Sequence, residues 1–591
     1  KANAVKVMAK KTLTLNQLLQ KGEAGKAALR KELRALVDHG AFTPKFHHEL
    51  SRTEKREAIS TFVFGKEKLN GTLKARGVQN GAQLQKREAY ENLFSPTSTP
   101  MTTMTHLTIA SHEGREVFSA DFPSAFLKTN RHKYNMPTEH TRISGKLAEL
   151  LCEEEPKYKK YLMNGCIYAQ LDRSVYGLPE ASANWFLELR DILLGFGMKQ
   201  MVKADPCLFV NTANNTAINV HVDDCLCSSK TSDGANYLKS KFAEHGCRIE
   251  EDSFLFLAMD IWQRPDKVIQ VGMETYLRKL LDEWKVEGEE KDPHKADLVP
   301  NKDDSGLSPH RTLYRSRLMA LMYAAVRTRF DILFTVGVLS QHMENPTNKN
   351  YSDLEHLIRY LNRTIADMIT LDGESLKIHV YADSSFLLYD ESKKGHSGVV
   401  VTLGEPGPIV SSKGTGKQKL VVPSSTGGEV VAAYEAVPVL RLAAALMKAF
   451  GLPSVPILHQ DNLSAIHMME SGRGSGKGTK HWDLRLQYMK QMLDHYEMTT
   501  EYTPTDDMLA DMNTKALTGK KFQDMYDTLR RADKCQTKEP KVNLIFDEFS
   551  TFIATLKRAM GSATKACKRM FSSRGAAECT YQRTVVGNIT Q

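Results

Sequence analysis

VFSADFPSAFL (117–127) and INVHVDDCLC (218–227) are the two stretches that decide how this chain folds. Both are runs of apolar residues typical of buried strands, yet Asp121 ends the first run, and Asp223 and Asp224 stand side by side inside the second. A buried strand seldom carries two adjacent carboxylates, because unpaired buried charge costs several kcal/mol. A solvated hairpin tip is the alternative, but apolar β-formers rather than Gly or Asn flank the pair. We therefore expect the pair to lie within a strand and to hold a metal ion.

The same pattern returns in the C-terminal half, where strand-like and helix-like segments alternate from residue 376. This alternation predicts an α/β domain with a mixed sheet. Carboxylates stand at strand ends and helix starts, namely Asp383, Glu429, Asp461 and Asp511. Clustered carboxylates repel one another unless hard divalent cations neutralise them, and Mg²⁺ prefers such oxygen ligands. Any one of the four would be an ordinary surface acid; together they predict a site for two ions about 3.5–4 Å apart, which suits phosphoryl transfer.

Length and composition limit the class of protein. The chain has 591 residues, enough for three or four domains, and its 41% hydrophobic content excludes a largely disordered chain. Lys and Arg number 80 against 70 Asp and Glu, a net charge of +10 that suits a polyanionic partner but is weak support by itself. The nine cysteines include no C-x-x-C pair, which argues against a zinc ribbon or a disulfide framework and favours a reducing compartment.

We expect no membrane-spanning segment, because charged residues and prolines interrupt the most apolar stretch (437–458). The N-terminus, KANAVKVMAKK, is basic, lacks the apolar region of a signal peptide and has no initiator Met. We expect the chain to be excised from a larger precursor or to be a trimmed piece.

From about residue 60 to about residue 525, the chain resembles the reverse transcriptase–RNase H region of copia-type LTR retrotransposon polyproteins. The motifs that carry this resemblance are SADFPSAFL (119–127), SVYGLPEASANW (174–185), ADPCLFV (204–210), VHVDDCLC (220–227), the segment 315–347, SSTGGEVVAAYEA (424–436), QDNLSAI (460–466), GTKHWDLR (478–485) and TPTDDMLADMNTK (503–515). Each motif is moderately specific, and this many in the same order is very specific.

The resemblance implies a multidomain α/β (α+β) fold with a right-hand polymerase, a helical connection and an RNase H-like mixed-sheet domain. The expected units are an N-terminal helical arm (1–45), fingers and palm (46–250), thumb and linker (251–300), helical connection (301–372), RNase H-like domain (373–530) and basic C-terminal tail (531–591). The implied activities are DNA synthesis on RNA or DNA templates and cleavage of the RNA strand of RNA:DNA hybrids. Both use two Mg²⁺ ions per active site, with Mn²⁺ as a substitute.

The implied partners are an RNA template, a DNA primer, the RNA:DNA hybrid and dNTPs; no membrane is implied, and a homodimer is left open. The implied location is the cytoplasm, within virus-like particles of a retroelement. Two alternatives stay open: a catalytically inactive nucleic-acid-binding derivative, and a domesticated enzyme with a cellular task. The retained carboxylates argue against the first, because a protein that only binds polyanions gains by losing them.

The resemblance also assigns roles to single residues. Asp121, Asp223 and Asp224 would be the polymerase metal ligands, and the four carboxylates of the C-terminal half would be those of the nuclease. Phe126 would screen the sugar 2′ carbon, with a plain core residue as the alternative. Lys74 and Arg76 would contact the triphosphate, with a solvated basic hairpin as an equal alternative without the family context.

Some positions depart from the family pattern or are weakly assigned. His221 replaces the usual Tyr of the YVDD box, and Glu180 stands where the family has Gln, which would add negative charge near a triphosphate. The first Glu of the family's SSTEAE is absent from SSTGGEV, while Glu429 is kept. His481 would touch the nuclease substrate, although a surface histidine is at least as plausible.

Overall fold

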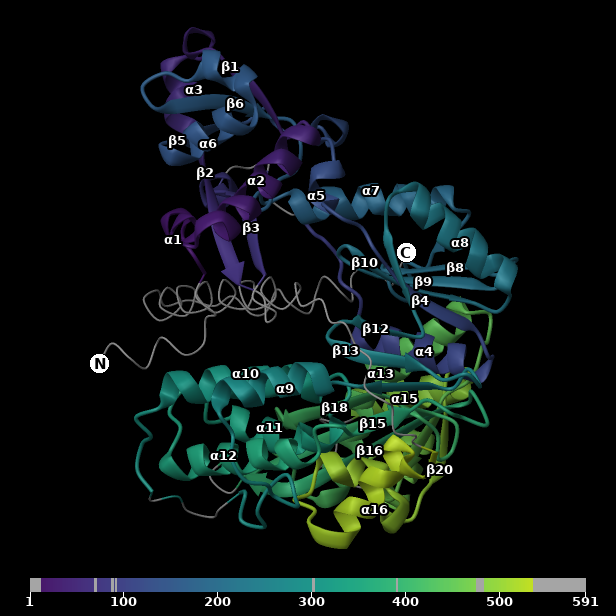
Figure 1. Cartoon of the computed structure of the whole chain (residues 1–591). Coiled ribbons are helices and arrows are strands. Elements are labelled where there is room, and N and C mark those ends of the chain that lie inside the picture. The colour runs from purple at the N-terminus through teal and green to yellow at the C-terminus, as the bar shows by residue number, and fades with distance from the viewer. Residues whose placement is uncertain are drawn as a thin grey trace.

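The structure, a computed structural model, describes residues 12–67, 72–86, 90, 93–299, 303, 305–389, 392–474 and 483–534. These residues form four sheets, each with its own helices (Figure 1). The expectation of a multidomain fold of mixed helices and sheets is therefore confirmed.

The N-terminal sheet has five strands in the order β1-β6-β5-β2-β3. Their bounds are β1 Phe42–Lys45, β2 Ile59–Glu67, β3 Leu73–Gln79, β5 His140–Ser144 and β6 Cys166–Leu171. The helices around it are α1 Leu15–Gln20, α2 Gly22–Asp38, α3 Arg52–Glu57 and α6 Lys146–Glu154. β2 and β3 form an antiparallel hairpin, as the Asn-Gly at 70–71 predicts, although that turn lies outside the described residues.

Helix α2 packs on the N-terminal sheet through apolar residues that recur at helical spacing. Leu29, Leu33 and Leu36 recur at helical spacing and are all buried, as the sequence predicts. The helix packs against β3, and the Glu32 carboxylate accepts a hydrogen bond of 2.7 Å from the backbone N–H of Gly77. The N-terminal arm is thereby tied to the strand that carries Lys74 and Arg76.

The second sheet is antiparallel and has six strands in the order β11-β4-β10-β9-β8-β7. Their bounds are β4 Glu116–Asp121, β7 Lys199–Gln200, β8 Leu208–Asn211, β9 Thr216–His221, β10 Asp224–Ser229 and β11 Arg248–Glu251. Helices α7 (Ala181–Gly195) and α8 (Ser232–Glu244) cover one face, where Trp185, Leu238 and Phe242 pack on the strands. The short helix α5 (Ala125–Lys128) follows β4.

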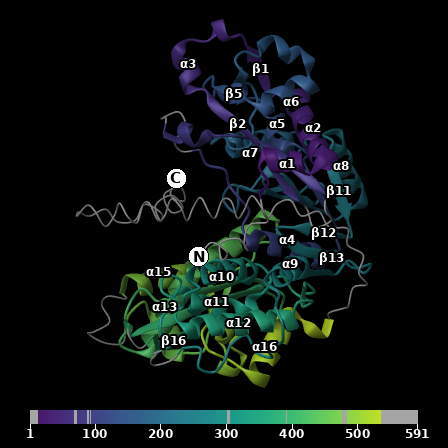
Figure 2. The ribbon, with the colours of Figure 1, turned by 60° about the vertical axis from the view of Figure 1, so that its left-hand side comes forward.

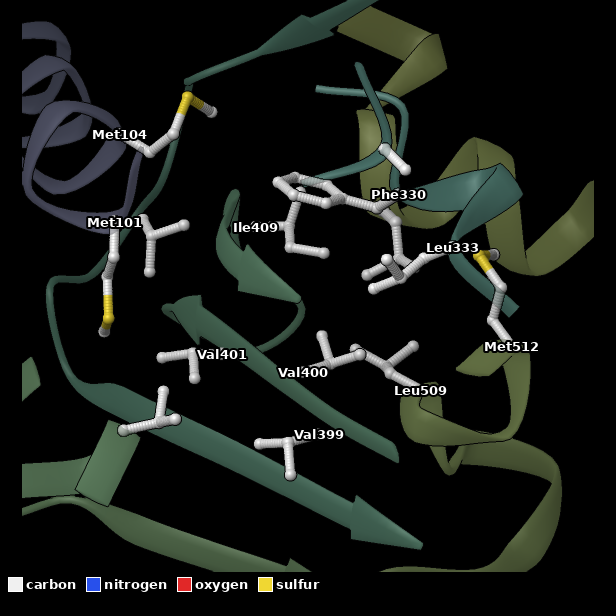
Figure 3. Close-up of a cluster of buried hydrophobic side chains, with 14 of the residues drawn as sticks. Met101, Met104, Phe330, Leu333, Val399, Val400, Val401, Ile409, Leu509 and Met512 are labelled. Carbon is white, nitrogen blue, oxygen red and sulfur yellow. The ribbon is translucent and has the colours of Figure 1, made fainter. Parts of the chain in front are cut away.

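Helix α4 (Pro100–His112) covers the opposite face, and all of its residues from Met101 to Ser111 are buried. It lies between the second sheet and the lower part of the molecule (Figures 1 and 2). Met101 and Met104 belong to the same buried hydrophobic cluster as Val401 and Ile409 of the fourth sheet (Figure 3). The two sheets therefore share one hydrophobic core, with α4 in the middle.

A third, antiparallel sheet with the order β12-β13-β14-β15 adjoins this core. Its strands are β12 Ser253–Phe256, β13 Met259–Gln263, β14 Ile269–Gly272 and β15 Met368–Thr370. The helices of this region are α9 Glu274–Trp284, α10 Arg311–Ala325, α11 Leu333–Ser340 and α12 Asn348–Arg363. The sequence predicts one long helix over 312–343, but the structure breaks it between α10 and α11, where Arg329 forms a buried ion pair with Asp331.

The fourth sheet is mixed, as predicted. Its order is β18-β17-β16-β19-β20, with β16, β17 and β18 antiparallel and β16, β19 and β20 parallel. The bounds are β16 Ile378–Tyr389, β17 Lys394–Leu403, β18 Ile409–Lys417, β19 Ile457–Gln460 and β20 Thr499–Tyr502. The helices are α13 Ser425–Ala449, α14 Leu463–Ser471, α15 Asp483–Asp494 and α16 Gly519–Arg530.

Helix α13 packs against β16 and β17. By length and composition alone it is apolar enough to cross a membrane, but 61% of its apolar window is buried inside the protein. The core helix of a globular domain passes the same test, so this feature is weak support for a membrane span.

Candidate active sites

The first group of carboxylates lies where three strands of the second sheet end or begin. Asp121 is the last residue of β4, and Asp224 is the first residue of β10 and pairs with Asp121 in the register of the two strands. β9 ends at His221, so Val222 and Asp223 form a two-residue turn between β9 and β10. The prediction that both aspartates lie inside one strand is therefore wrong: they occupy a hairpin tip. The tip is not a freely solvated one, however, because Asp223 and Asp224 are both half-buried.

This turn is held in a conformation that its sequence does not favour. Val222 has a φ of 57°, which is rare for a β-branched residue and costs about 1–3 kcal/mol. Two hydrogen bonds stabilise it: Trp185 Nε1–H donates to the Val222 carbonyl at 2.7 Å, and the Phe122 N–H donates to the Asp223 carbonyl at 3.1 Å. The surrounding structure, rather than turn-forming residues, fixes the position of Asp223.

The electrostatics of this group favour a bound cation. Burial, followed by repulsion from Asp121, raises the pKa of Asp223 to about 6, while Arg76 and Lys74 act in the opposite direction. Asp121 accepts a hydrogen bond from the guanidinium of Arg248 at 3.2 Å. Carboxylate oxygens are ligands of the type that Mg²⁺ prefers, and a bound cation would relieve the repulsion between Asp121 and Asp223.

Residues of the N-terminal sheet approach the same group. The guanidinium of Arg76 lies 4.4 Å from the ring centre of Tyr176, and Phe126 meets that ring edge-on at 4.9 Å. Arg76 and Lys74 are half-buried on β3, and their charges stabilise the ionised form of Asp223. The reading of Lys74 and Arg76 as a hairpin that only faces solvent is thus not supported.

The sequence analysis missed Tyr176. Its ring is mostly buried, and burial raises its pKa to about 12. The backbone carbonyl of Tyr176 accepts a hydrogen bond of 2.7 Å from the N–H of Gln79, and Gly177 follows with a φ of 92°. A Cβ on Gly177 would lie 2.2 Å from the Gln79 carbonyl oxygen, so this glycine permits the close approach of the two segments. The Tyr-Gly pair in SVYGLPEAS was the available signal.

Glu180 is not where the sequence analysis expects it. Its side chain is fully buried and accepts a hydrogen bond of 2.7 Å from Arg131 Nε, whose side chain is 1% exposed. Arg131 also donates to the Tyr90 hydroxyl at 3.0 Å, and Tyr90 donates to Glu139 at 3.1 Å. The prediction that Glu180 adds negative charge near a triphosphate is therefore wrong, because Arg131 neutralises it in the interior.

His221 lies half-buried at the end of β9. Burial, with a smaller effect of the nearby Arg327, lowers its pKa to about 4, so the imidazole is neutral at pH 7. His481 lies outside the described residues.

The second group of carboxylates lies at the edge of the fourth sheet. Carboxylate oxygens of Asp383 on β16, Glu429 on α13 and Asp461 after β19 lie within 4.8 Å of one another. Ser384 and Gln460 donate to Glu429 at 2.9 and 3.3 Å, and Thr505 donates to Asp461 at 2.9 Å. Burial raises the pKa of Asp383 to about 6 and that of Glu429 well above its usual range.

Asp511 lies beside this group but is held differently. It is fully buried, and Lys515 Nζ lies 2.5 Å from its Oδ1 and 3.8 Å from a carboxylate oxygen of Asp383. The other oxygen, Oδ2, has no hydrogen-bond partner among the described residues. The structure thus brings three of the four predicted carboxylates together, while the fourth, Asp511, is ion-paired with Lys515. The three-carboxylate donor set fits a hard divalent cation.

Part of the chain matches a known protein family. Residues 49–292 match the family described as reverse transcriptase (RNA-dependent DNA polymerase). The chain is 25% identical over 466 residues to the retrovirus-related Pol polyprotein from transposon TNT 1-94 of Nicotiana tabacum, covering 76% of this chain and 33% of that protein.

Two further relatives match at similar levels. The corresponding polyprotein from transposon RE1 of Arabidopsis thaliana is 26% identical, covering 76% of this chain and 30% of that protein. The transposon Ty1-GR3 Gag-Pol polyprotein of Saccharomyces cerevisiae is 23% identical, covering 86% and 29%. This chain therefore spans about a third of the length of these curated relatives.

A solved structure, the foamy viral protease-reverse transcriptase with RNA/DNA hybrid, matches with a TM-score of 0.44 at 12% identity, covering 88% of this chain and 57% of that chain. A second foamy viral structure, with double-stranded DNA, matches with a TM-score of 0.47, also at 12% identity, covering 82% and 70%. The sequence matches carry the comparison: residues 49–292 match the reverse transcriptase family, and about three quarters of the chain is similar to the Pol polyproteins of copia-type retrotransposons.

Proposed function

We propose that this chain is an RNA-directed DNA polymerase that extends a DNA primer on an RNA or DNA template. One observation carries the proposal: Asp121, Asp223 and Asp224 stand at the adjoining ends of β4 and β10 within the reverse transcriptase match, and Arg76 and Lys74 lie close enough to Asp223 to favour its ionised form. Carboxylates for a metal and cations for a triphosphate are the two charge types that nucleotidyl transfer needs at one place.

The residues of the first group then have separate tasks. Asp121, Asp223 and Asp224 would hold Mg²⁺, with Mn²⁺ as a substitute. When bound, the ions supply charge neutralisation and activation of the primer 3′ hydroxyl. Arg76 and Lys74 would bind the phosphates of the incoming dNTP. Phe126, edge-on to Tyr176, would pack against the 2′ carbon of the sugar and exclude a hydroxyl there.

We further propose that the fourth sheet carries a ribonuclease H activity toward the RNA strand of an RNA:DNA hybrid. The support is the three-carboxylate group of Asp383, Glu429 and Asp461. Two divalent ions at such a group can stabilise both the attacking and the leaving oxygen of a phosphodiester. Lys515 would keep Asp511 ion-paired beside the group. The positive charge of Lys515 offsets part of the repulsion between the carboxylates.

The experiment uses the full chain and a DNA primer on an RNA template, with separate labels on the primer and on the RNA 5′ end. We expect primer extension with dNTPs and Mg²⁺, RNA shortening wherever hybrid has formed, and loss of both with a chelator. If the chain bound the duplex but did not extend the primer in either Mg²⁺ or Mn²⁺, it would be a nucleic-acid-binding derivative without polymerase activity. A homodimer and a location in cytoplasmic virus-like particles stay predictions of the sequence resemblance.

A further inference from the structure

A second kind of ligand set lies in the fourth sheet, apart from the carboxylate group. It consists of His379 on β16, His459 on β19 and Glu405 in the turn between β17 and β18. One ligand atom from each residue lies within 4.8 Å of the others. His379 Nδ1 is 2.8 Å from His459 Nε2 and 3.6 Å from Glu405 Oε2. Three segments distant in sequence thus point two ring nitrogens and a carboxylate at one spot.

The two imidazoles are held edge to edge. Their ring centres are 5.1 Å apart and their planes differ by only 20°, so the facing nitrogens lie close to both ring planes. The far nitrogen of His459, Nδ1, hydrogen-bonds to Thr503 Oγ1 at 2.7 Å, and the Tyr381 ring stacks on His459 at 4.4 Å. A hydrogen bond to the far nitrogen is how proteins orient a histidine that binds a metal.

Burial favours neutral imidazoles here, since His459 is fully buried and the His379 side chain is 4% exposed. Without an ion, one nitrogen of the facing pair donates and the other accepts, which is a satisfied polar pair within a sheet. That arrangement alone does not need Glu405, whose side chain is half-exposed and whose Oε2 lies 3.6 Å from His379 Nδ1.

We propose that His379, His459 and Glu405 form a binding site for a divalent transition-metal ion of the Zn²⁺ type. When Thr503 accepts the Nδ1–H of His459, the Nε2 lone pair of His459 is available. His379 becomes a ligand through Nδ1 by carrying its single proton on Nε2, so both rings stay neutral. Two imidazoles and one carboxylate select Zn²⁺ over Mg²⁺ and leave a fourth tetrahedral position for water.

Zn–N distances of about 2.0–2.1 Å in a tetrahedral site place the two nitrogens about 3.3 Å apart. The rings must therefore separate by about 0.5 Å and also tilt, so that the two nitrogens face the ion instead of each other. Glu501, which pairs with His459 in the register of β19 and β20, adds negative charge nearby. The ion would tie β16 and β19 to the β17–β18 turn, about 13 Å along β16 from Asp383.

The test uses the full chain after removal of metals with a chelator. Co²⁺ serves as the spectroscopic probe, because a tetrahedral site gives it strong visible absorption, and Zn²⁺ should displace it. We expect one such ion per chain in the wild type. Glu405→Ala should weaken Zn²⁺ binding by at least tenfold, measured by calorimetry, and should reduce the rise in Tm that Zn²⁺ causes. Glu405 is the residue to change because its half-exposed position makes misfolding improbable.

Two matched variants test whether the ion binds at this site, rather than through nearby negative charge or at the carboxylate group of Asp383, Glu429 and Asp461. Glu501→Ala removes a neighbouring negative charge that is not a ligand, and it should change Zn²⁺ affinity by less than threefold. Asp383→Asn should leave the Co²⁺ spectrum unchanged. Equal Zn²⁺ affinity in the wild type and Glu405→Ala, or loss of the Co²⁺ bands in Asp383→Asn only, would overturn the proposal.

Discussion

Trp185 Nε1–H donates a hydrogen bond of 2.7 Å to the backbone carbonyl of Val222. This contact ties α7 to the turn that presents Asp223, at a residue whose φ of 57° is unfavourable for valine. Because the turn has no glycine to relax it, its geometry depends on partners outside the hairpin.

Trp185→Phe keeps most of the buried ring but removes this donor. A hydrogen bond of this type contributes about 0.5–1.5 kcal/mol, so we expect primer extension to fall by about three- to tenfold while hybrid cleavage keeps its rate. Steady-state assays of both activities measure this. Trp284→Phe, at another buried tryptophan, is the control and should affect neither assay selectively.

The buried Arg131–Glu180 pair predicts a stability effect. Glu180→Gln leaves the Arg131 charge without its partner, which typically costs about 3–5 kcal/mol when one member of a buried pair is removed. We expect a large fall in the free energy of unfolding, measured with urea, and no improvement in KM for dNTP. Glu188→Gln, which breaks a more exposed pair with Lys133, should cost less than about 1 kcal/mol. If Glu180→Gln instead lowered the KM for dNTP without destabilising the protein, Glu180 would have to lie near the bound nucleotide.

Phe126 is half-buried, meets the Tyr176 ring edge-on at 4.9 Å and follows Asp121 by five residues. Phe126→Val should raise the relative kcat/KM for ribonucleotides by about two orders of magnitude, because steric overlap with the 2′ hydroxyl is relieved. Incorporation ratios and Tm are measured on the same variant. A lower Tm of the kind that core truncation causes, with unchanged sugar selectivity, would show that Phe126 is only a core residue.

The raised carboxyl pKa values predict a pH dependence in metal-free buffer. The pKa of Asp223 rises from its usual 3.8 to about 6 in the folded protein, so the folded state favours the protonated form. This contribution to stability is fully present below about pH 4 and is lost as the pH rises through about 6. Asp383 behaves in the same way.

Asparagine imitates the protonated carboxyl at all pH values. The Tm of Asp223→Asn should therefore exceed that of the wild type by more at pH 7.5 than at pH 4.5, with a chelator present. Mg²⁺ should narrow the difference at pH 7.5 by stabilising the ionised wild type. Asp38→Asn, at an exposed site, should show the same offset at both pH values; a constant offset for Asp223→Asn would contradict the prediction.

The parts of the fold that follow from local pattern are predictable from the sequence. The apolar face of α2, the end of β4 at Asp121 and the mixed order of the fourth sheet all agree with the structure. Helix α4 was not expected, because it is buried on all sides and its threonines hide the amphipathic period.

The features that the sequence does not predict depend on partners distant in the chain. The turn at Val222 contains no glycine or asparagine and is held by Trp185. Glu180 is paired with Arg131, 49 positions away. Periodicity and motif spacing carry no information about such contacts.

The central claim is that two independent carboxylate groups perform two reactions, and crossed variants test it most directly. DNA synthesis and cleavage of a preformed RNA:DNA hybrid are measured for Asp223→Asn and Glu429→Gln, with the fold checked by circular dichroism. We expect Asp223→Asn to lose synthesis by several orders of magnitude and keep cleavage, and Glu429→Gln to do the reverse. Loss of both activities in either variant, with the fold intact, would contradict the account.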